Sequence, residues 1–189
     1  MKTLITDIDE VLLKFSAIYE PWVISELEKR NFDWVPYYSD HGLWIYDDHP
    51  DLDAELINDF INNSPKFSNL PAVDDAAHYL RMFREDGWDI IGLSACINTD
   101  HVVEKRLHNI KNSLGFELDD LIHVGVMQSK HAELSKLNKG VFVDDSWSHC
   151  IAGHLTGHRV YWFSDHDSPN NIIPSVSNWS MIAAMEGLI

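Results

Sequence analysis

The chain has 189 residues, 45% of them hydrophobic, which is enough for one sizeable core and too few for two full domains with a linker. Its net charge of −16 would repel a polyanion, and no basic run offsets that charge, so we expect no long nucleic acid as a partner. A single nucleotide or another small phosphoester stays compatible, because one metal ion and one or two cations neutralise a local phosphate.

Two cysteines, Cys96 and Cys150, are too few for a disulfide framework and are predicted to be reduced core thiols. The apolar stretch at the N-terminus is broken by Asp7 and Asp9 before it could serve as a signal sequence. No run of about 18 apolar residues is present, which argues against a membrane helix. We therefore expect a cytoplasmic protein, a monomer or homodimer, with no membrane contact.

Short apolar runs rich in β-branched residues alternate with helical patterns along most of the chain. The predicted strands cover residues 3–8, 88–94, 121–126, 141–143 and 159–163, and the predicted helices cover 73–86, 99–115 and 130–138. The apolar face of the helix at 99–115 is expected to consist of Val102, Val103, Leu107, Ile110 and Leu114. Alternation of this kind predicts an α/β fold with a doubly wound, Rossmann-like parallel sheet.

Residues 15–70 depart from this alternation and are predicted to form a small helical cap inserted after the first strand, leaving 1–14 and 71–189 as the core. Helical patterns occur around 18–30 and 50–63. The aromatic residues between them include Trp34, Tyr37, Trp44 and Tyr46. These rings could stack a nucleobase, although aromatic residues at this density more often form the core of a small cap.

Two carboxylates, Asp7 and Asp9, follow the first predicted strand. A carboxylate can attack phosphorus to form an aspartyl-phosphate, while a neighbouring acid protonates the departing oxygen and later activates water. A turn just past the strand end would aim the two side chains at different atoms. Acidic residues at strand ends are also common as turn formers and helix caps, so this motif alone is a moderate signal.

A hydroxyl group and an ammonium group follow two later strands. Ser94 and Ala95 end one strand, where a hydroxyl and backbone N–H groups can bind a phosphoryl oxygen. Lys130 opens the helix at 130–138 and could neutralise both the phosphoryl group and an attacking carboxylate. The alternative interpretations are an ordinary loop serine and a solvated surface lysine.

A second acidic pair, Asp144 and Asp145, ends the strand at 141–143. Mg²⁺ needs only one or two protein carboxylates, since it keeps several waters and also binds substrate phosphate. Two like charges at a buried strand end would raise each other's pKa unless a cation joined them. Asp145 or Ser146 could instead cap the following helix and still leave Asp144 as a metal ligand.

Taken in order, these motifs resemble those of the haloacid dehalogenase superfamily, and the resemblance covers residues 1–14 and 70–165. It implies a Mg²⁺-dependent hydrolase. The implied roles are Asp7 as nucleophile and metal ligand, Asp9 as acid/base whose carbonyl also meets the metal, Ser94, Ala95 and Lys130 as phosphate binders, and Asp144 and Asp145 as further metal ligands. Because both acids of the first motif are present, the resemblance favours a phosphatase over a dehalogenase.

Within the superfamily, the insertion after the first strand and the segment 67–76 look most like the 5'(3')-deoxyribonucleotidase type. One departure is Glu10, where that group usually has glycine. The expected partner is therefore a small phosphorylated metabolite or a nucleotide. The alternative from another class is a non-catalytic protein that keeps the fold and binds phosphate or metal without turnover, against which the presence of Asp9 argues.

Overall fold

The computed structural model describes residues 2–32, 37–39, 42–44, 50–126 and 128–189. A six-stranded sheet, in which all neighbouring strands are parallel, forms its centre in the order β5-β4-β1-β6-β7-β8. The strands are β1 (Lys2–Thr6), β4 (Trp88–Ala95), β5 (Asp120–Val124), β6 (Val141–Asp144), β7 (Arg159–Phe163) and β8 (Ser175–Val176). All five predicted strands are present, and the short edge strand β8 was not predicted.

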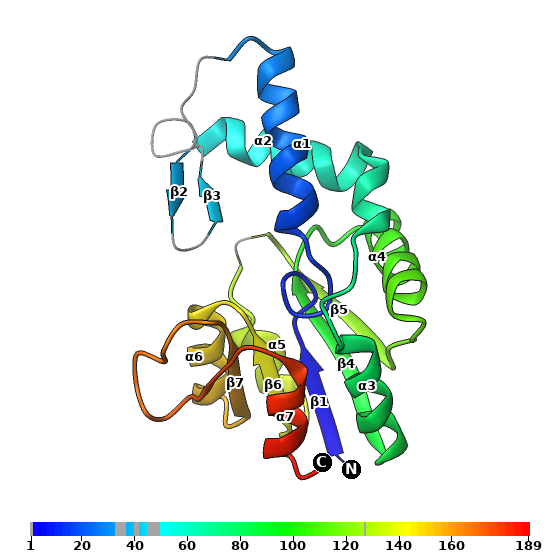
Figure 1. Cartoon of the computed structure of the whole chain (residues 1–189), viewed down its shortest axis with the longest axis vertical. Coiled ribbons are helices and arrows are strands. Elements are labelled where there is room, and N and C mark those ends of the chain that lie inside the picture. The colour runs from blue at the N-terminus through cyan, green and yellow to red at the C-terminus, as the bar shows by residue number, and fades with distance from the viewer. Residues whose placement is uncertain (1, 33–36, 40–41, 45–49, 127) are drawn as a thin grey trace.

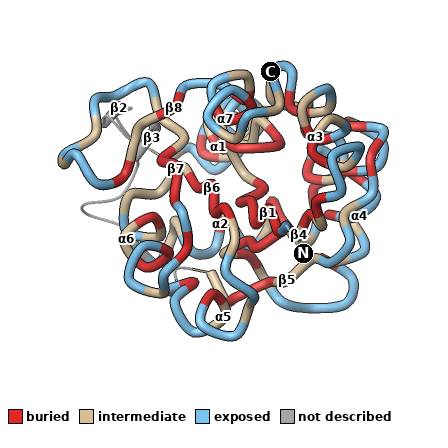
Figure 2. The backbone as a smooth tube through the Cα atoms, turned by 90° about the horizontal axis from the view of Figure 1, so that it is seen from below, coloured by how far each residue is buried: buried red, intermediate tan, exposed pale blue. Residues whose placement is uncertain are grey.

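Helices cover both faces of this sheet, as the doubly wound prediction requires. They are α3 (Ala76–Glu85), α4 (Asp100–Leu114), α5 (His131–Lys136), α6 (Trp147–Leu155) and α7 (Trp179–Met185). One buried cluster joins Leu4 to residues of α3, α4 and α7, while a second joins Ile5 to residues of α5 and α6. Successive side chains of β1 thus enter opposite cores, and Figure 2 shows the buried central strands between these two groups of helices.

The inserted cap contains two helices, α1 (Ser16–Lys29) and α2 (Pro50–Asn63), which confirms the two predicted helical segments. Between them lies a hairpin of β2 (Tyr37–Ser39) and β3 (Gly42–Trp44), and a 3₁₀ turn, η1 (Pro65–Asn69), leads back to the core. Val23 and Leu27 of α1 pack with Leu56 of α2. Figure 1 places this cap beyond the end of β1, at the carboxyl edge of the sheet.

Helix α4 buries a more polar face than its sequence pattern predicted. Arg106 and Asn109 are both fully buried, whereas Leu107, expected in the apolar face, is 42% exposed. Val102, Ile110 and Leu114 are buried as expected, but Leu107 was placed on the wrong side. Hydrophobic periodicity ranks faces by apolar content, so it cannot register polar side chains that find partners inside the fold.

Asn109 holds the segment that returns from the cap. Its Oδ1 accepts a hydrogen bond from the Leu70 N–H at 3.0 Å, and its Nδ2 donates to the Leu70 carbonyl at 2.9 Å. Ser113 Oγ donates to the same carbonyl at 2.7 Å. The return segment is therefore fixed to α4 by directional bonds. Among the described residues, none of the helices combines the length and apolar character needed to cross a membrane.

Replacing Asn109 by alanine should destabilise the fold by about 1 to 3 kcal/mol, because the buried Leu70 N–H loses its partner. Urea unfolding would measure the loss. Asn112→Ala is the control on the same helix, since Asn112 is exposed and its side chain contacts the exposed His108 at 2.7 Å. A similar stability for both variants would contradict this account of the Leu70 contact.

His158, which directly precedes β7, forms hydrogen bonds through its neutral ring to backbone groups of Leu134 and Gly140. Its Nε2 lies 2.9 Å from the Leu134 carbonyl, and its Nδ1 accepts from the Gly140 N–H at 3.4 Å. Burial lowers the pKa of His158 below its ordinary value of 6.5, although the Leu134 carbonyl opposes the shift. Between these two pKa values the unfolded chain binds a proton that the folded chain does not.

The contribution of His158 to stability should thus be complete above about pH 6.5 and lost as the pH falls through the interval below it. His158→Gln should flatten the decline of unfolding free energy between neutral and mildly acidic pH, because the variant has no titrating ring there. Chemical denaturation at several pH values would test this, with the exposed His154→Gln as control. Parallel pH profiles for the parent and His158→Gln would refute it.

Candidate active site and metal centre

The predicted site residues meet at the carboxyl edge of the central strands. Asp7 directly follows β1, Asp144 is the last residue of β6, and Ser94 lies near the end of β4. These three strands are neighbours in the sheet, with β1 between the other two. Lys130 occupies the N-cap position of α5, after β5. Parallel strands bring residues that are distant in sequence to one edge, which is where open α/β sheets bind ligands.

Lys130 forms the centre of this site. Its ammonium nitrogen lies 2.9 Å from Asp7 Oδ1 and 2.6 Å from Asp144 Oδ2. The Lys130 and Asp144 side chains are completely buried, and the Asp7 side chain is 11% exposed. A second contact fixes the Asp7 carboxylate, because the Ile8 N–H donates to Asp7 Oδ1 at 2.7 Å. The solvated-surface alternative for Lys130 is therefore wrong.

The two carboxylates bound by Lys130 differ in acidity. Burial raises the pKa of Asp7 to about 6, with Lys130 opposing the rise and Asp144 and Asp9 adding to it. For Asp144, burial also favours the neutral acid, but the Lys130 ammonium and His149 outweigh it and lower the pKa. Asp144 is thus the more acidic of the two, and the ionised form of Asp7 is stabilised less by its surroundings.

Asp145 and Glu10 are two further carboxyl groups close to this pair. Burial raises the pKa of Asp145 well above its ordinary value, and the charges of Asp7 and Asp144 raise it further. Glu10 adopts a left-handed backbone conformation with φ of 58°. That conformation explains why glycine suits this position, and the Ser16 N–H donates to Glu10 Oε1 at 2.5 Å, which stabilises the strained turn.

The donor atoms of this site fit a divalent cation. Among the described residues, Asp7, Asp144 and His149 each offer one ligand atom, and these atoms all lie within 4.8 Å of one another. The carboxylates of Asp7, Asp144 and Asp145 face a single buried ammonium, so an additional positive charge would relieve their repulsion. Carboxylate oxygens are the ligands that Mg²⁺ prefers, whereas His149 would suit a softer metal.

The carboxylate of Asp9 is held by a residue that the sequence analysis missed. Arg106 Nη2 of α4 lies 2.9 Å from Asp9 Oδ2, and the Arg106 side chain is fully buried. The signal was present in the sequence, because Arg106 shares a helical stripe with Val102 and Ile110 at spacings of four residues. A charged residue inside an apolar stripe indicates a buried ionic partner.

A hollow of about 780 Å³ opens beside the site. Its lining includes Glu10 and Asp145 together with Trp147, Trp162 and Asp165. The hollow is large enough for a small metabolite. Figure 1 shows the cap hairpin of β2 and β3 on the same side of the molecule as α6 and β7, which supply much of this lining.

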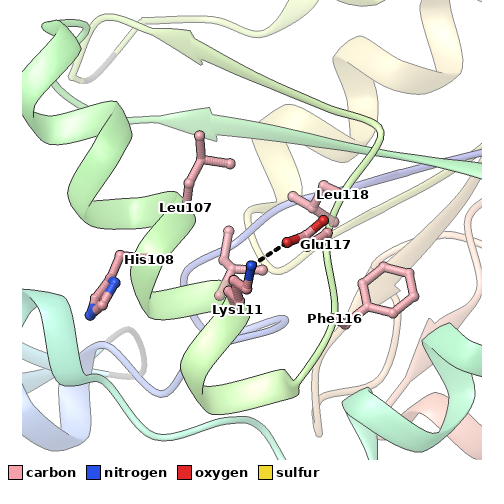
Figure 3. Close-up of a pocket in the computed structure, with 7 residues that line it drawn as sticks. Leu107, His108, Lys111, Phe116, Glu117 and Leu118 are labelled. Atoms are coloured by element: carbon pink, nitrogen blue, oxygen red, sulfur yellow. Dashed lines mark hydrogen bonds and ion pairs between the residues drawn. The ribbon is translucent and has the colours of Figure 1, made fainter.

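Another pocket, of about 310 Å³, lies away from this edge and is shown in Figure 3. Leu107 and Lys111 of α4 line it together with Phe116 and Glu117, which precede β5. The Lys111 ammonium is paired with Glu117 at 2.6 Å. This pocket therefore lies at the amino end of β5, whereas the acidic cluster of Asp7, Asp144 and Asp145 lies at the carboxyl edge of the sheet. The pocket does not belong to the site.

Four aromatic residues of the cap were predicted to contact substrate. Trp34 and Tyr46 lie outside the described residues. Tyr37 and Trp44 are opposite one another in the β2–β3 hairpin, but their side chains are outside the description as well. Nucleobase stacking by these four residues stays a prediction, and so does phosphate binding by Ser94 and Ala95.

Comparison with known proteins places the fold. No family model and no curated protein matches this chain in sequence. A HAD family hydrolase from Deinococcus radiodurans R1, solved with bound phosphate and sodium, is 17% identical with a TM-score of 0.65, covering 100% of this chain and 96% of that one. A Bacillus subtilis protein named as a HAD-hydrolase and bound to magnesium is 15% identical with a TM-score of 0.64, covering 98% of each chain.

Dehalogenases share the same architecture. One, solved with an intermediate complex, is 13% identical with a TM-score of 0.65, and the match covers 98% of this chain and 96% of that one. At such low identity these likenesses show the fold alone. The chain therefore has the fold of the haloacid dehalogenase hydrolases, as its motifs predicted.

Mg²⁺ should stabilise the folded chain, by about 2.7 kcal/mol at a concentration 100 times its dissociation constant, because only the folded state assembles the carboxylates. Asp144→Asn should abolish most of the shift in thermal unfolding, since the variant loses a buried carboxylate of the site. Asp120→Asn, at the exposed start of β5, is the control and should keep the full shift. An equal shift in both variants would place the ion elsewhere.

Proposed function

We propose that this chain is a Mg²⁺-dependent phosphatase that hydrolyses a small phosphomonoester through an aspartyl-phosphate on Asp7. The observation that carries this proposal is the buried Lys130 ammonium, 2.9 Å from Asp7 and 2.6 Å from Asp144, with a second acid, Asp9, two residues after Asp7. A fixed cation beside a carboxylate nucleophile is what an incoming dianionic phosphoryl group requires.

In the first step, an Asp7 carboxylate oxygen attacks phosphorus and the bond from phosphorus to the ester oxygen breaks. Lys130 holds the attacking carboxylate and neutralises part of the charge that gathers on the phosphoryl oxygens. Asp9 gives its proton to the departing oxygen, so an alcohol leaves and Asp9 becomes a carboxylate. The product is an acyl phosphate on Asp7.

In the second step, water attacks the phosphorus of this acyl phosphate. The Asp9 carboxylate accepts a proton from the attacking water, the bond between phosphorus and the Asp7 oxygen breaks, and inorganic phosphate is released. Both residues thereby return to their starting states. The dehalogenase reaction has no departing alkoxide to protonate, which is why Asp9 favours phosphoester chemistry here.

The remaining residues of the site receive supporting roles. Asp7, Asp144 and Asp145, with the Asp9 carbonyl, would hold Mg²⁺, which when bound polarises the phosphoryl group. Ser94 and the backbone at Ala95 would bind phosphoryl oxygens at the end of β4, next to β1. The bound phosphate of the Deinococcus radiodurans hydrolase supports a phosphate-sized site on this fold.

The substrate is proposed to be a small phosphorylated metabolite, with 5'-nucleotides as the first class to examine. The hollow of about 780 Å³ is lined by Asp145 and by Ser16 and Glu20 of the cap helix α1, and it is large enough to hold a compact leaving group. The cap over the carboxyl edge would exclude bulk water and select the substrate. A screen of nucleotides and sugar phosphates in the presence of Mg²⁺ would identify the class.

The chemical assignment predicts that the parent releases phosphate from p-nitrophenyl phosphate only when Mg²⁺ is present. Asp7→Asn should remove turnover, because an amide is a poor nucleophile, and Asp9→Asn should lower it by about 10²- to 10⁴-fold. Phosphate release is the measurement, and Asp120→Asn is the control that changes a carboxylate outside the site.

Equal rates for the parent, Asp7→Asn and Asp9→Asn would rule out this mechanism. A parent that binds Mg²⁺ and phosphate but turns over none of the screened esters would support the non-catalytic alternative.

A further inference from the structure

Arg106 is a buried cation that has no role in the mechanism above. It lies on α4, its side chain has no exposed surface, and its Nη2 is 2.9 Å from Asp9 Oδ2. Because it is inaccessible, its guanidinium cannot bind substrate. An arginine stays charged at any physiological pH, so its buried N–H groups need acceptors, and Asp9 Oδ2 supplies one of them.

The surroundings of Arg106 hold the guanidinium in place. Its central carbon lies 4.2 Å from the ring centroid of Phe67, which is itself fully buried in the 3₁₀ turn η1. Its neighbour Lys105 donates to the Ile61 carbonyl at 3.4 Å and also to the Asn62 carbonyl. The helix that carries Arg106 is therefore bound to the last turn of the cap helix α2, independently of Asp9.

Asp9 is held from one side only. The turn that carries it is fixed by backbone hydrogen bonds from Leu12 and Leu13 to the Ile8 carbonyl, both at 2.9 Å. Its Oδ2 is occupied by Arg106, while Oδ1 is buried without a hydrogen-bond partner among the described residues. Among the described residues, the Asp9 carboxylate is therefore oriented by one side-chain contact, the ion pair of Oδ2 with Arg106.

We propose that Arg106 is a positioning residue that fixes the orientation of the Asp9 carboxylate through Oδ2. This inference rests on the proposed phosphatase function and assigns a residue outside the predicted motifs. Without Arg106 the Asp9 side chain would rotate among rotamers, and only some of them would present a protonated oxygen to the departing alcohol.

Esters with different leaving groups separate positioning of the acid from general support of the fold. A p-nitrophenolate ion leaves readily without a proton, whereas a simple alkoxide needs protonation. We therefore expect Arg106→Met to lower kcat/KM for an alkyl phosphate such as glycerol 2-phosphate about 10- to 100-fold more than for p-nitrophenyl phosphate. The ratio kcat/KM is informative because it reports the step in which the alcohol leaves.

A matched control and a double variant complete the experiment. Lys105→Met removes a neighbouring cation that touches the cap segment but not Asp9, so it should leave the ratio between the two esters unchanged. In an Asp9→Asn background, Arg106→Met should cause no further loss that depends on the leaving group, because its effect acts through Asp9. If Arg106→Met does not fold, Arg106→Lys is tested instead, since it keeps a cation but loses the planar guanidinium.

Equal losses for both esters, or no loss, in a folded Arg106 variant would overturn the inference while leaving the proposed function intact. A leaving-group effect of the same size in the Asp9→Asn background would also overturn it. A parent that hydrolyses neither ester would instead overturn the proposed function, and the positioning role with it.

Discussion

The ion pairs of Lys130 with Asp7 and Asp144 are the constraint on which the rest of the site depends. Three charged groups from separate stretches of the chain share a nearly dry space, and none of them could be buried there alone. Burial of this kind requires β1 and β6 to lie in their observed parallel register, with Thr6 opposite Val143. The same interaction gathers the groups that are proposed to bind a metal and a phosphoryl group.

A second group of polar contacts, on α4, connects the segment returning from the cap to the turn that carries Asp9. Asn109 fixes both backbone groups of Leu70, and Arg106 reaches Asp9 three residues earlier on the helix. Apolar packing permits small displacements, but hydrogen bonds and ion pairs fix distance and direction. The core helix therefore provides a common reference for the end of the cap and for the proposed acid/base.

The fold by itself does not identify the reaction. Two hydrolases, one solved with phosphate and one with magnesium, share this fold with TM-scores of 0.65 and 0.64, and a dehalogenase shares it with a TM-score of 0.65. The residues of this chain narrow the choice. In the proposed mechanism, Asp7 is a nucleophile common to both chemistries, while Asp9 is an acid that only phosphoester cleavage needs. Burial and the neighbouring carboxylates raise the pKa of Asp145, so a bound cation would favour its ionised form.

The sequence by itself determined five strands of the central sheet, the helices of the cap and the two acidic pairs that begin at Asp7 and Asp144. It could do so because apolar runs and the polar residues that end them are local signals. Only the tertiary structure decided which side chains are paired. Arg106 contacts Asp9, which is 97 residues away in the sequence, and Asn109 contacts Leu70, which is 39 residues away. Helical periodicity instead predicted that Leu107 is buried and did not predict burial of Arg106 or Asn109. A buried polar group is stabilised by its partner rather than by its own hydrophobicity. A helical stripe can mark such a group, as it does Arg106, but it does not identify a partner that is distant in the sequence.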